Sequence, residues 1–140
     1  MQKRVIYILF VLFFQSCTFS VENIKIGKAQ CHFCKMTISD ARFGGALLTQ
    51  KGKTYHFDDM FCLQSFISNE MVHKIDIRQL YIQNYDGTNE LIEVQKAYLI
   101  ESKNINGPMN GHWIGFKSKE SYFPFAKTMN GKEVQENIFR

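Results

Sequence analysis

The first hydrophobic run of the chain is short and precedes the part that we expect to fold. Residues 5–14 are all apolar, and they follow the basic start Met1-Gln2-Lys3-Arg4. A membrane-spanning helix needs about 20 apolar residues, whereas a run of this length after a basic start is typical of a secretory signal peptide. The pattern therefore predicts a signal peptide over residues 1–16, followed by a tether over residues 17–28.

After the tether, the pattern changes to short elements separated by polar turns. Strand-like residues occupy 37–40, 43–50 and 54–57, and the last two runs are joined by a tight turn at 51–53. Asp59 then precedes a stretch with helical spacing that ends near Asn69. The apolar positions of that stretch are Phe61, Leu63, Phe66 and Ile67. The first half therefore predicts two strands and a helix that either Asp58 or Asp59 can cap.

The second half repeats this order. Residues 77–85 alternate between apolar and polar, and 91–100 predict one or two further strands. A loop at 104–108 leads to a strand at 112–116. Ser118 then caps a helix over 119–129, which Pro124 is expected to kink or split. A last short strand follows at 132–134.

An offset of about 59 residues aligns the two halves of this pattern. It places Phe57 on Phe116 and Asp59 on Ser118, and it also pairs helical positions. We predict an α+β fold of two small β–β–α–β modules packed together, over residues 29–76 and 77–140.

Composition and charge limit the classes of function. The chain has 140 residues, 45% of them hydrophobic, so it can bury a core. Removing residues 1–16 takes away two of the 17 basic residues and no acidic one, which leaves 15 against 13, a net charge of +2. That charge is too small for a nucleic-acid partner.

The residues that follow the apolar run predict where the protein resides. Phe14-Gln15-Ser16-Cys17 resembles the lipobox of bacterial lipoproteins, in which the cysteine becomes the lipidated first residue. We expect a lipid anchor at Cys17 that holds the protein on the extracytoplasmic (periplasmic) face of a cell membrane. Ordinary secretion with cleavage nearby is the alternative.

The candidate chemistry gathers in Cys31-His32-Phe33-Cys34-Lys35-Met36. Cys31 and Cys34 have the spacing that lets two sulfurs meet on one metal ion or on each other. A c-type haem needs a histidine where Lys35 stands, and a four-thiolate zinc site needs a second pair of cysteines. A thioredoxin-like pair needs a helix start, whereas strand-forming residues follow here. A zinc site that uses Cys62 and a histidine remains an alternative.

Further sulfur and imidazole groups favour copper. In an extended segment Cys34 and Met36 share a face, and a thioether suits Cu(I) better than zinc. Cys62 falls in the first turn of the predicted helix, where thiolate is favoured. Met109 and His112 lie in a loop framed by glycine and proline and are candidates to complete the site.

At this point the motifs resemble those of the NosL family. They are Cys-x-x-Cys-x-Met-x-Ile at 31–38, Arg-Phe-Gly-Gly at 42–45, Lys-Gly-Lys-x-Tyr-x-Phe-Asp-Asp-x-x-Cys at 51–62 and Pro-Met-x-Gly at 108–111. The resemblance implies a copper-binding lipoprotein associated with nitrous oxide reductase, with a fold likened to that of organomercurial lyase. It also implies lipid at Cys17, a metal motif at Cys31, Cys34 and Met36, and a late methionine at Met109.

The sequence thus predicts a monomeric Cu(I) carrier that is not an enzyme. It would bind one ion per chain and pass it to an extracytoplasmic copper enzyme, nitrous oxide reductase by the resemblance. Two other functions remain open. Cys31 and Cys34 can form a thiol–disulfide oxidoreductase site, or an inert disulfide can staple a structural module.

Overall fold

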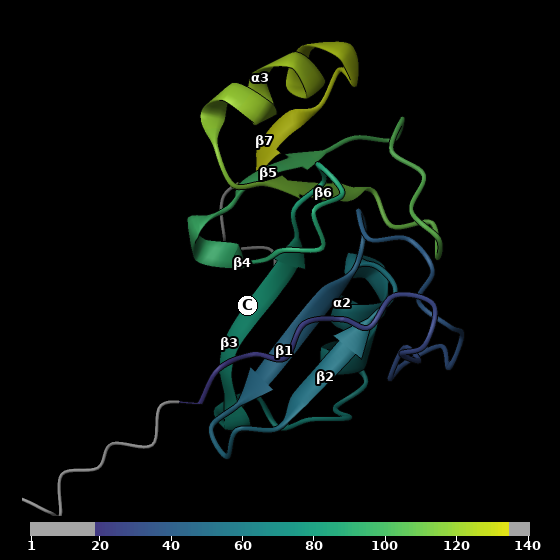
Figure 1. Cartoon of the computed structure of the whole chain (residues 1–140), viewed down its shortest axis with the longest axis vertical. Helices are drawn as coiled ribbons and strands as arrows, with labels where there is room; N and C mark the ends of the chain where they lie inside the picture. The colour runs from purple at the N-terminus through teal and green to yellow at the C-terminus, as the bar shows by residue number, and fades with distance from the viewer. Residues whose placement is uncertain (1–18, 135–140) are drawn as a thin grey trace, which may run out of the picture.

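The computed structural model describes residues 19–134, which form two antiparallel sheets, each with one helix (Figure 1). The signal peptide predicted at 1–16 and the lipid site predicted at Cys17 lie outside the described residues. The elements are β1 (Gly45–Thr49), β2 (Thr54–Phe57), α2 (Met60–Ser68), a 3₁₀ turn at Lys74–Asp76, β3 (Ile77–Gln83), β4 (Leu91–Glu93), a 3₁₀ turn at Val94–Lys96, β5 (Tyr98–Glu101), β6 (Trp113–Phe116), α3 (Lys119–Thr128) and β7 (Lys132–Val134). Between residues 19 and 134, no helix has the length and apolar character that crossing a membrane requires.

Both halves of the chain build the same strand–strand–helix–strand unit. The first strand of each unit lies in the middle, so the order is β2-β1-β3 in one sheet and β6-β5-β7 in the other, with all pairs antiparallel. Phe57 and Phe116 end equivalent strands and are both buried. Asp59 and Ser118 cap the two helices with their side chains. The predicted α+β fold of two β–β–α–β modules is confirmed.

The division between the two sheets lies later in the chain than the predicted boundary at residues 76 and 77. β3 pairs with β1, and β4 extends the first sheet beyond β3. The first sheet therefore ends with β4 at Glu93, and the second begins with β5 at Tyr98. The two units meet where the residues that follow β3 lie beside β6, since Tyr85 N–H donates to Gly115 O at 2.9 Å.

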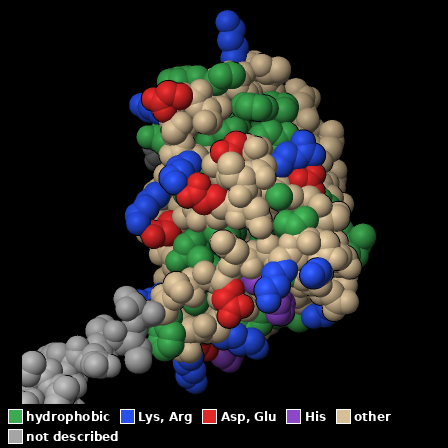
Figure 2. Space-filling model, viewed as in Figure 1, with side chains coloured by type: hydrophobic (Ala, Val, Ile, Leu, Met, Phe, Trp, Pro, Cys, Tyr) green, Lys and Arg blue, Asp and Glu red, His purple; other side chains and the backbone are tan. Residues whose placement is uncertain are grey.

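The helices form where the apolar spacing and the caps predict them. α2 buries Met60, Cys62, Leu63, Phe66 and Ile67 against the first sheet, whereas Phe61 faces outward with 43% of its surface exposed. α3 begins after Ser118 and runs unbroken through Pro124, so the proline does not split it. Figure 2 shows basic and acidic side chains interspersed over one face of the molecule.

Residues 19–28 of the segment predicted as a tether lie on the first module instead of extending away from it (Figure 1). Ile24 is 1% exposed and belongs to the hydrophobic core. Its side chain fills space above Gly44, where a Cβ would lie 2.9 Å from Ile24 Cδ1. The Ile24 carbonyl accepts a hydrogen bond from Asn89 Nδ2 at 3.1 Å. Burial of this side chain stabilises the attachment of the segment, because an isoleucine contributes a few kcal/mol when it leaves water.

Candidate metal centre

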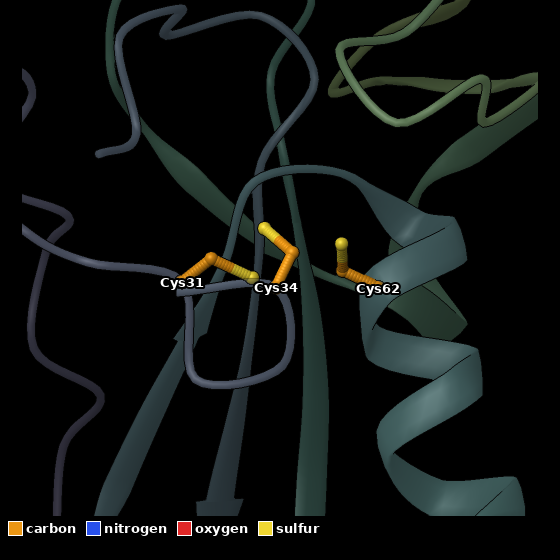
Figure 3. Close-up of side chains that lie close together, drawn as sticks. All are labelled: Cys31, Cys34 and Cys62. Atoms are coloured by element: carbon orange, nitrogen blue, oxygen red, sulfur yellow. The ribbon is translucent and has the colours of Figure 1, made fainter. Parts of the chain in front are cut away.

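Three cysteine sulfurs meet at one end of the first module. The Sγ atoms of Cys31, Cys34 and Cys62 lie within 4.8 Å of one another, and all three thiols are free. Figure 3 shows Cys31 and Cys34 projecting from one turn beside the start of α2, which carries Cys62. Cys31 and Cys62 are fully buried and Cys34 is partly exposed. The cluster therefore has two inner sulfurs and one that solvent reaches.

The turn that carries Cys31 and Cys34 is the tip of a small hairpin. Cys31 N–H donates to Met36 O at 2.8 Å, and Lys35 N–H donates to Cys31 O at 3.0 Å. Lys35 has a positive φ of 66°, a left-handed conformation that reverses the chain. The expectation of an extended segment at Cys34–Met36 was wrong, because this reversal breaks the alternation of side chains. The predicted strand at 37–40 is likewise reduced to a single bridge between Thr37 and Gln30.

A histidine pair anchors this turn to β2. His32 N–H donates to His56 O at 2.9 Å, and His56 N–H donates to His32 Nδ1 at 3.0 Å. Nδ1 of His32 is therefore an acceptor, so the neutral ring carries its proton on Nε2. Burial lowers the pKa of His32, which favours this neutral form. The pair fixes Cys31 and Cys34 relative to the strand that leads into α2.

Cys62 is held by the cap of its own helix. Asp59 is the N-cap, and its Oδ1 accepts a hydrogen bond from Cys62 N–H at 3.0 Å. The predicted cap is confirmed, and it places Cys62 at the third position of α2. A side chain at this position points to the side of the helix start, where the Cys31–Cys34 turn lies.

The three thiols have different pKa values, because they differ in hydrogen bonding and burial. A hydrogen bond from Cys62 lowers the pKa of Cys31 from 9.0 to about 5, although burial acts in the opposite direction. Main-chain N–H groups directed at the Cys31 sulfur add to the lowering, and they belong to Cys34, Asp58 and Phe33. The bond to Cys31 raises the pKa of Cys62, and burial raises the pKa of Cys34. In the empty cluster the lowered pKa favours the thiolate form of Cys31, whereas the raised pKa values favour the thiol forms of Cys34 and Cys62.

Asp58 adds a buried carboxylate beside the cluster. It is 2% exposed, and its Oδ1 has no hydrogen-bond partner among residues 19–134. Burial, followed by the negative charge of Cys31, raises the pKa of Asp58 to about 6. Its main-chain N–H points at the Cys31 sulfur. Asp58 therefore positions Cys31 through its main chain and adds negative charge near the sulfurs through its side chain.

The loop that carries Met109 reaches the site from the second module. Met109 is partly buried and packs against the core cluster that contains Cys31 and Cys62. Asp59 Oδ2 accepts hydrogen bonds from Met109 N–H at 2.9 Å and from Gly111 N–H at 3.0 Å. One carboxylate thus serves the helix that carries Cys62 and the loop that carries Met109.

Two other predicted site residues, Met36 and His112, have surroundings that differ from those of the buried cysteines. The Met36 side chain is 56% exposed, at the outer edge of the Cys31–Cys34 turn. His112 Nδ1 bonds to Ile105 O at 2.8 Å, and the residue lines a separate pocket of about 600 Å³ with Lys103 and Lys132. Among the histidine, cysteine and acidic side chains of the described chain, only the three cysteines converge as metal ligands.

Sequence reasoning did not anticipate two features of the site. Nothing in the pattern pairs His32 with His56, because both are lone histidines on short elements. The sequence also does not indicate that Asp59 binds the loop that carries Met109, because this loop begins 48 residues later, at Gly107. The glycines on both sides of Met109 are the only trace of that contact in the sequence.

Chemically, the cluster offers three soft donors to one ion. Thiolate sulfur selects Cu(I), zinc or iron–sulfur centres. Zinc is usually bound by four ligands, whereas Cu(I) is satisfied by two or three. Three sulfurs, one of them open to solvent, match an ion that is bound and then passed on.

Comparisons with known proteins place this geometry in context. The sequence model of the NosL family matches residues 24–137. The crystal structure of the copper chaperone NosL from Shewanella denitrificans resembles this chain with a TM-score of 0.72 at 18% sequence identity. The match covers 86% of this chain and 96% of that one, which shows a shared fold. No curated protein matches the sequence significantly.

Proposed function

Because this chain belongs to the NosL family, we propose that it is a membrane-anchored Cu(I) chaperone that delivers copper to an extracytoplasmic copper enzyme. The observation that carries the proposal is the convergence of the Cys31, Cys34 and Cys62 sulfurs within 4.8 Å. The relative from Shewanella denitrificans, which shares the fold, is itself described as a copper chaperone.

The graded burial of the sulfurs supports a carrier. Cys31 and Cys62 are fully buried and retain the ion, whereas Cys34 is partly exposed and Met36 is 56% exposed. A ligand from an acceptor protein can add to the ion on the exposed side while Cys34 leaves it. The ion then moves between proteins without being released into solvent, and no catalytic step is required.

A thiol–disulfide oxidoreductase fits the geometry less well. Such enzymes expose the low-pKa cysteine of the pair, usually at a helix start. Here the cysteine with the lowered pKa is Cys31, which is fully buried in a hairpin turn. The thiol at the helix start is Cys62, which is also buried and has a raised pKa. A disulfide reagent therefore meets neither of these sulfurs at the surface.

The proposed location rests on the sequence of residues 1–17. A signal peptide over residues 1–16 and a lipid at Cys17 would hold the domain on the extracytoplasmic face of the membrane. The motifs shared with the family favour nitrous oxide reductase as the acceptor. In cells, Cys17→Ser should move the protein from the membrane fraction to the soluble fraction. Retention on the membrane would contradict the lipid anchor.

The metal proposal is tested by titrating the reduced protein with Cu(I) against a chromophoric chelator. We expect one tightly bound ion per chain, and X-ray absorption should count three sulfur neighbours. The Cys31→Ser/Cys34→Ser double variant should lose tight binding. Equal binding by wild type and this variant would exclude the cluster as the site. Disulfide-reductase activity without copper binding would favour the oxidoreductase, and a stable disulfide in the non-reduced mass would favour a structural staple.

A further inference from the structure

Asp59 is bonded to both modules at the point where they face the sulfur cluster. We propose that residues Gly107–Gly111, here called the Met109 loop, form a lid over the cluster, and that the Asp59 carboxylate is the latch that holds this lid closed. Asp59 is in this view a positioning residue that controls access to the sulfurs. Its consequence for copper exchange rests on the function proposed above.

The latch consists of one carboxylate with two separate tasks. Oδ1 caps α2 through Cys62 N–H at 3.0 Å, and Oδ2 accepts Met109 N–H at 2.9 Å and Gly111 N–H at 3.0 Å. Asp59 is 1% exposed, so water does not compete for these bonds. A hydrogen bond to a charged acceptor is stronger than one between neutral groups. The closed position of the loop is therefore favoured by two charge-assisted bonds.

The loop is built to move as a unit. Asn110 N–H donates to Gly107 O at 2.9 Å, and Gly107 N–H donates to Gly111 O at 3.0 Å. Pro108 stiffens the turn between these bonds, and Met109 lies at its tip. Because the loop closes on itself, release of the two Asp59 bonds frees the whole segment without unfolding β5 or β6.

The approach of the loop to Asp59 leaves no room for side chains. A Cβ added to Gly107 would lie 2.9 Å from Asp59 Oδ2, and one added to Gly111 would lie 2.7 Å from it. Both distances are below normal contact, so either addition must push the loop and the carboxylate apart. The three atoms nearest to a Cβ on Gly111 all belong to Asp59, whereas a Cβ on Gly107 would also lie 2.9 Å from Gly111 O within the loop.

The loop reaches the first module, next to the start of the helix that carries Cys62, from the other module. Met109 packs against the core that includes Cys31 and Cys62, and the second module contains no cysteine of its own. The equivalent cap in that module, Ser118, instead accepts from Ser121 N–H within its own helix at 3.3 Å. The cap that also binds a distant loop is therefore the one beside the sulfurs.

The Asp59→Asn variant separates the two tasks. An asparagine oxygen still caps Cys62 N–H, but its NH₂ group cannot accept from Met109 or Gly111. A charge-assisted bond shifts an equilibrium by about ten-fold or more. We therefore expect amide hydrogen exchange at Met109 and Gly111 to accelerate at least about ten-fold in the apo-protein. Alkylation of the cluster thiols should accelerate as well, and transfer of Cu(I) to an excess of chelator should become faster.

A second variant and a control make the test decisive. Gly111→Ala keeps the carboxylate and the cap but displaces the loop, so it should reproduce the faster exchange and alkylation. Ser118→Ala removes the equivalent cap of α3 and should leave the Met109 loop and the thiols unchanged. Unchanged amide exchange in both Asp59→Asn and Gly111→Ala would overturn the latch. Faster amide exchange with unchanged alkylation would overturn the lid.

The test separates this inference from the proposed function. If the wild-type protein binds no Cu(I), the chaperone proposal fails, whereas amide exchange and alkylation of the apo-protein still decide whether Asp59 latches a lid. If copper binds but Asp59→Asn releases it no faster than wild type, the lid does not control exchange.

Discussion

The main-chain nitrogen of Met109 lies 2.9 Å from Asp59 Oδ2, a contact that joins residues 50 positions apart. It couples the loop of the second module to the helix that presents Cys62. The site is therefore shared by the two modules, although all three sulfurs belong to the first.

This double role predicts that Asp59→Ala destabilises the apo-protein more than Ser118→Ala does. Loss of a helix cap costs about 1 kcal/mol. Asp59→Ala also leaves the partly buried N–H of Met109 and the buried N–H of Gly111 without their acceptor, which adds about 1–3 kcal/mol. Urea denaturation should give a loss of about 3 kcal/mol for Asp59→Ala and about 1 kcal/mol for Ser118→Ala. Equal losses would mean that the loop contacts contribute nothing to stability.

The contrast between Asp59 and its loop explains how far the sequence could predict the structure. The Asp59 cap and the position of Cys62 follow from local rules, because the donor is three residues from the acceptor. The strand–strand–helix–strand order follows from periodicity for the same reason. The contact with Met109 depends on how two modules dock, which no local pattern encodes.

The Cys31–Cys34 turn was mispredicted for a related reason. Strand-forming residues at 36–38 suggested an extended segment, but Lys35 adopts a left-handed conformation without the usual glycine or asparagine. Two sets of hydrogen bonds stabilise that conformation: those within the turn and those between His32 and His56. The His32–His56 pair is a tertiary contact, which local sequence does not indicate. Convergence of Cys31 and Cys34 followed from their spacing, and Cys62 was a candidate from its place in the helix, whereas the geometry of the turn was not predicted.

The thiolate on Cys31 should be visible in the apo-protein. We expect a step in the ultraviolet thiolate absorbance near pH 5, because the pKa of Cys31 is lowered from 9.0 to about 5. The stability that this thiol contributes is complete above pH 9.0 and is lost as the pH falls to about 5. Cys62→Ala removes the main cause of the lowering, so the step should move to higher pH. Because the pKa of Cys34 is raised above its usual 9.0, a second step at high pH is expected, and the absence of any step below neutral pH would contradict this assignment.

Asp58→Asn should stabilise the apo-protein at neutral pH. The pKa of Asp58 is raised from 3.8 to about 6, so ionisation of this buried carboxyl opposes folding as the pH rises through that range. An asparagine removes the penalty, which amounts to up to about 3 kcal/mol above pH 6. Below pH 3.8 both side chains are neutral and the gain should vanish. Urea denaturation of the wild type and Asp58→Asn at neutral pH and below pH 3.8 measures the gain in stability at each pH. An equal gain at both pH values would exclude the electrostatic cause.

The attachment of the N-terminal segment leads to a last prediction, which concerns how far the cluster can stand from a membrane. Ile24 is 1% exposed, and Glu22 is bonded on both sides, with its N–H donating to Thr54 Oγ1 and its carbonyl accepting from His56 Nε2. If Cys17 carries lipid, no more than the chain between Cys17 and Glu22 can separate the attached segment from the bilayer, and this stretch spans at most about 18 Å. The sulfur cluster would then stay close to the bilayer surface.

Ile24→Ala tests this attachment. Truncation of a buried isoleucine costs about 2–5 kcal/mol, so urea denaturation should show a loss in that range. Ile75→Ala is the matched control, because Ile75 is 86% exposed and its truncation should change stability by less than about 0.5 kcal/mol. Amide exchange at residues 22–28 should also accelerate in Ile24→Ala, since the core contact that fixes the segment is lost. Equal stability of the two variants would show that the segment is a free tether, as the sequence pattern alone suggests.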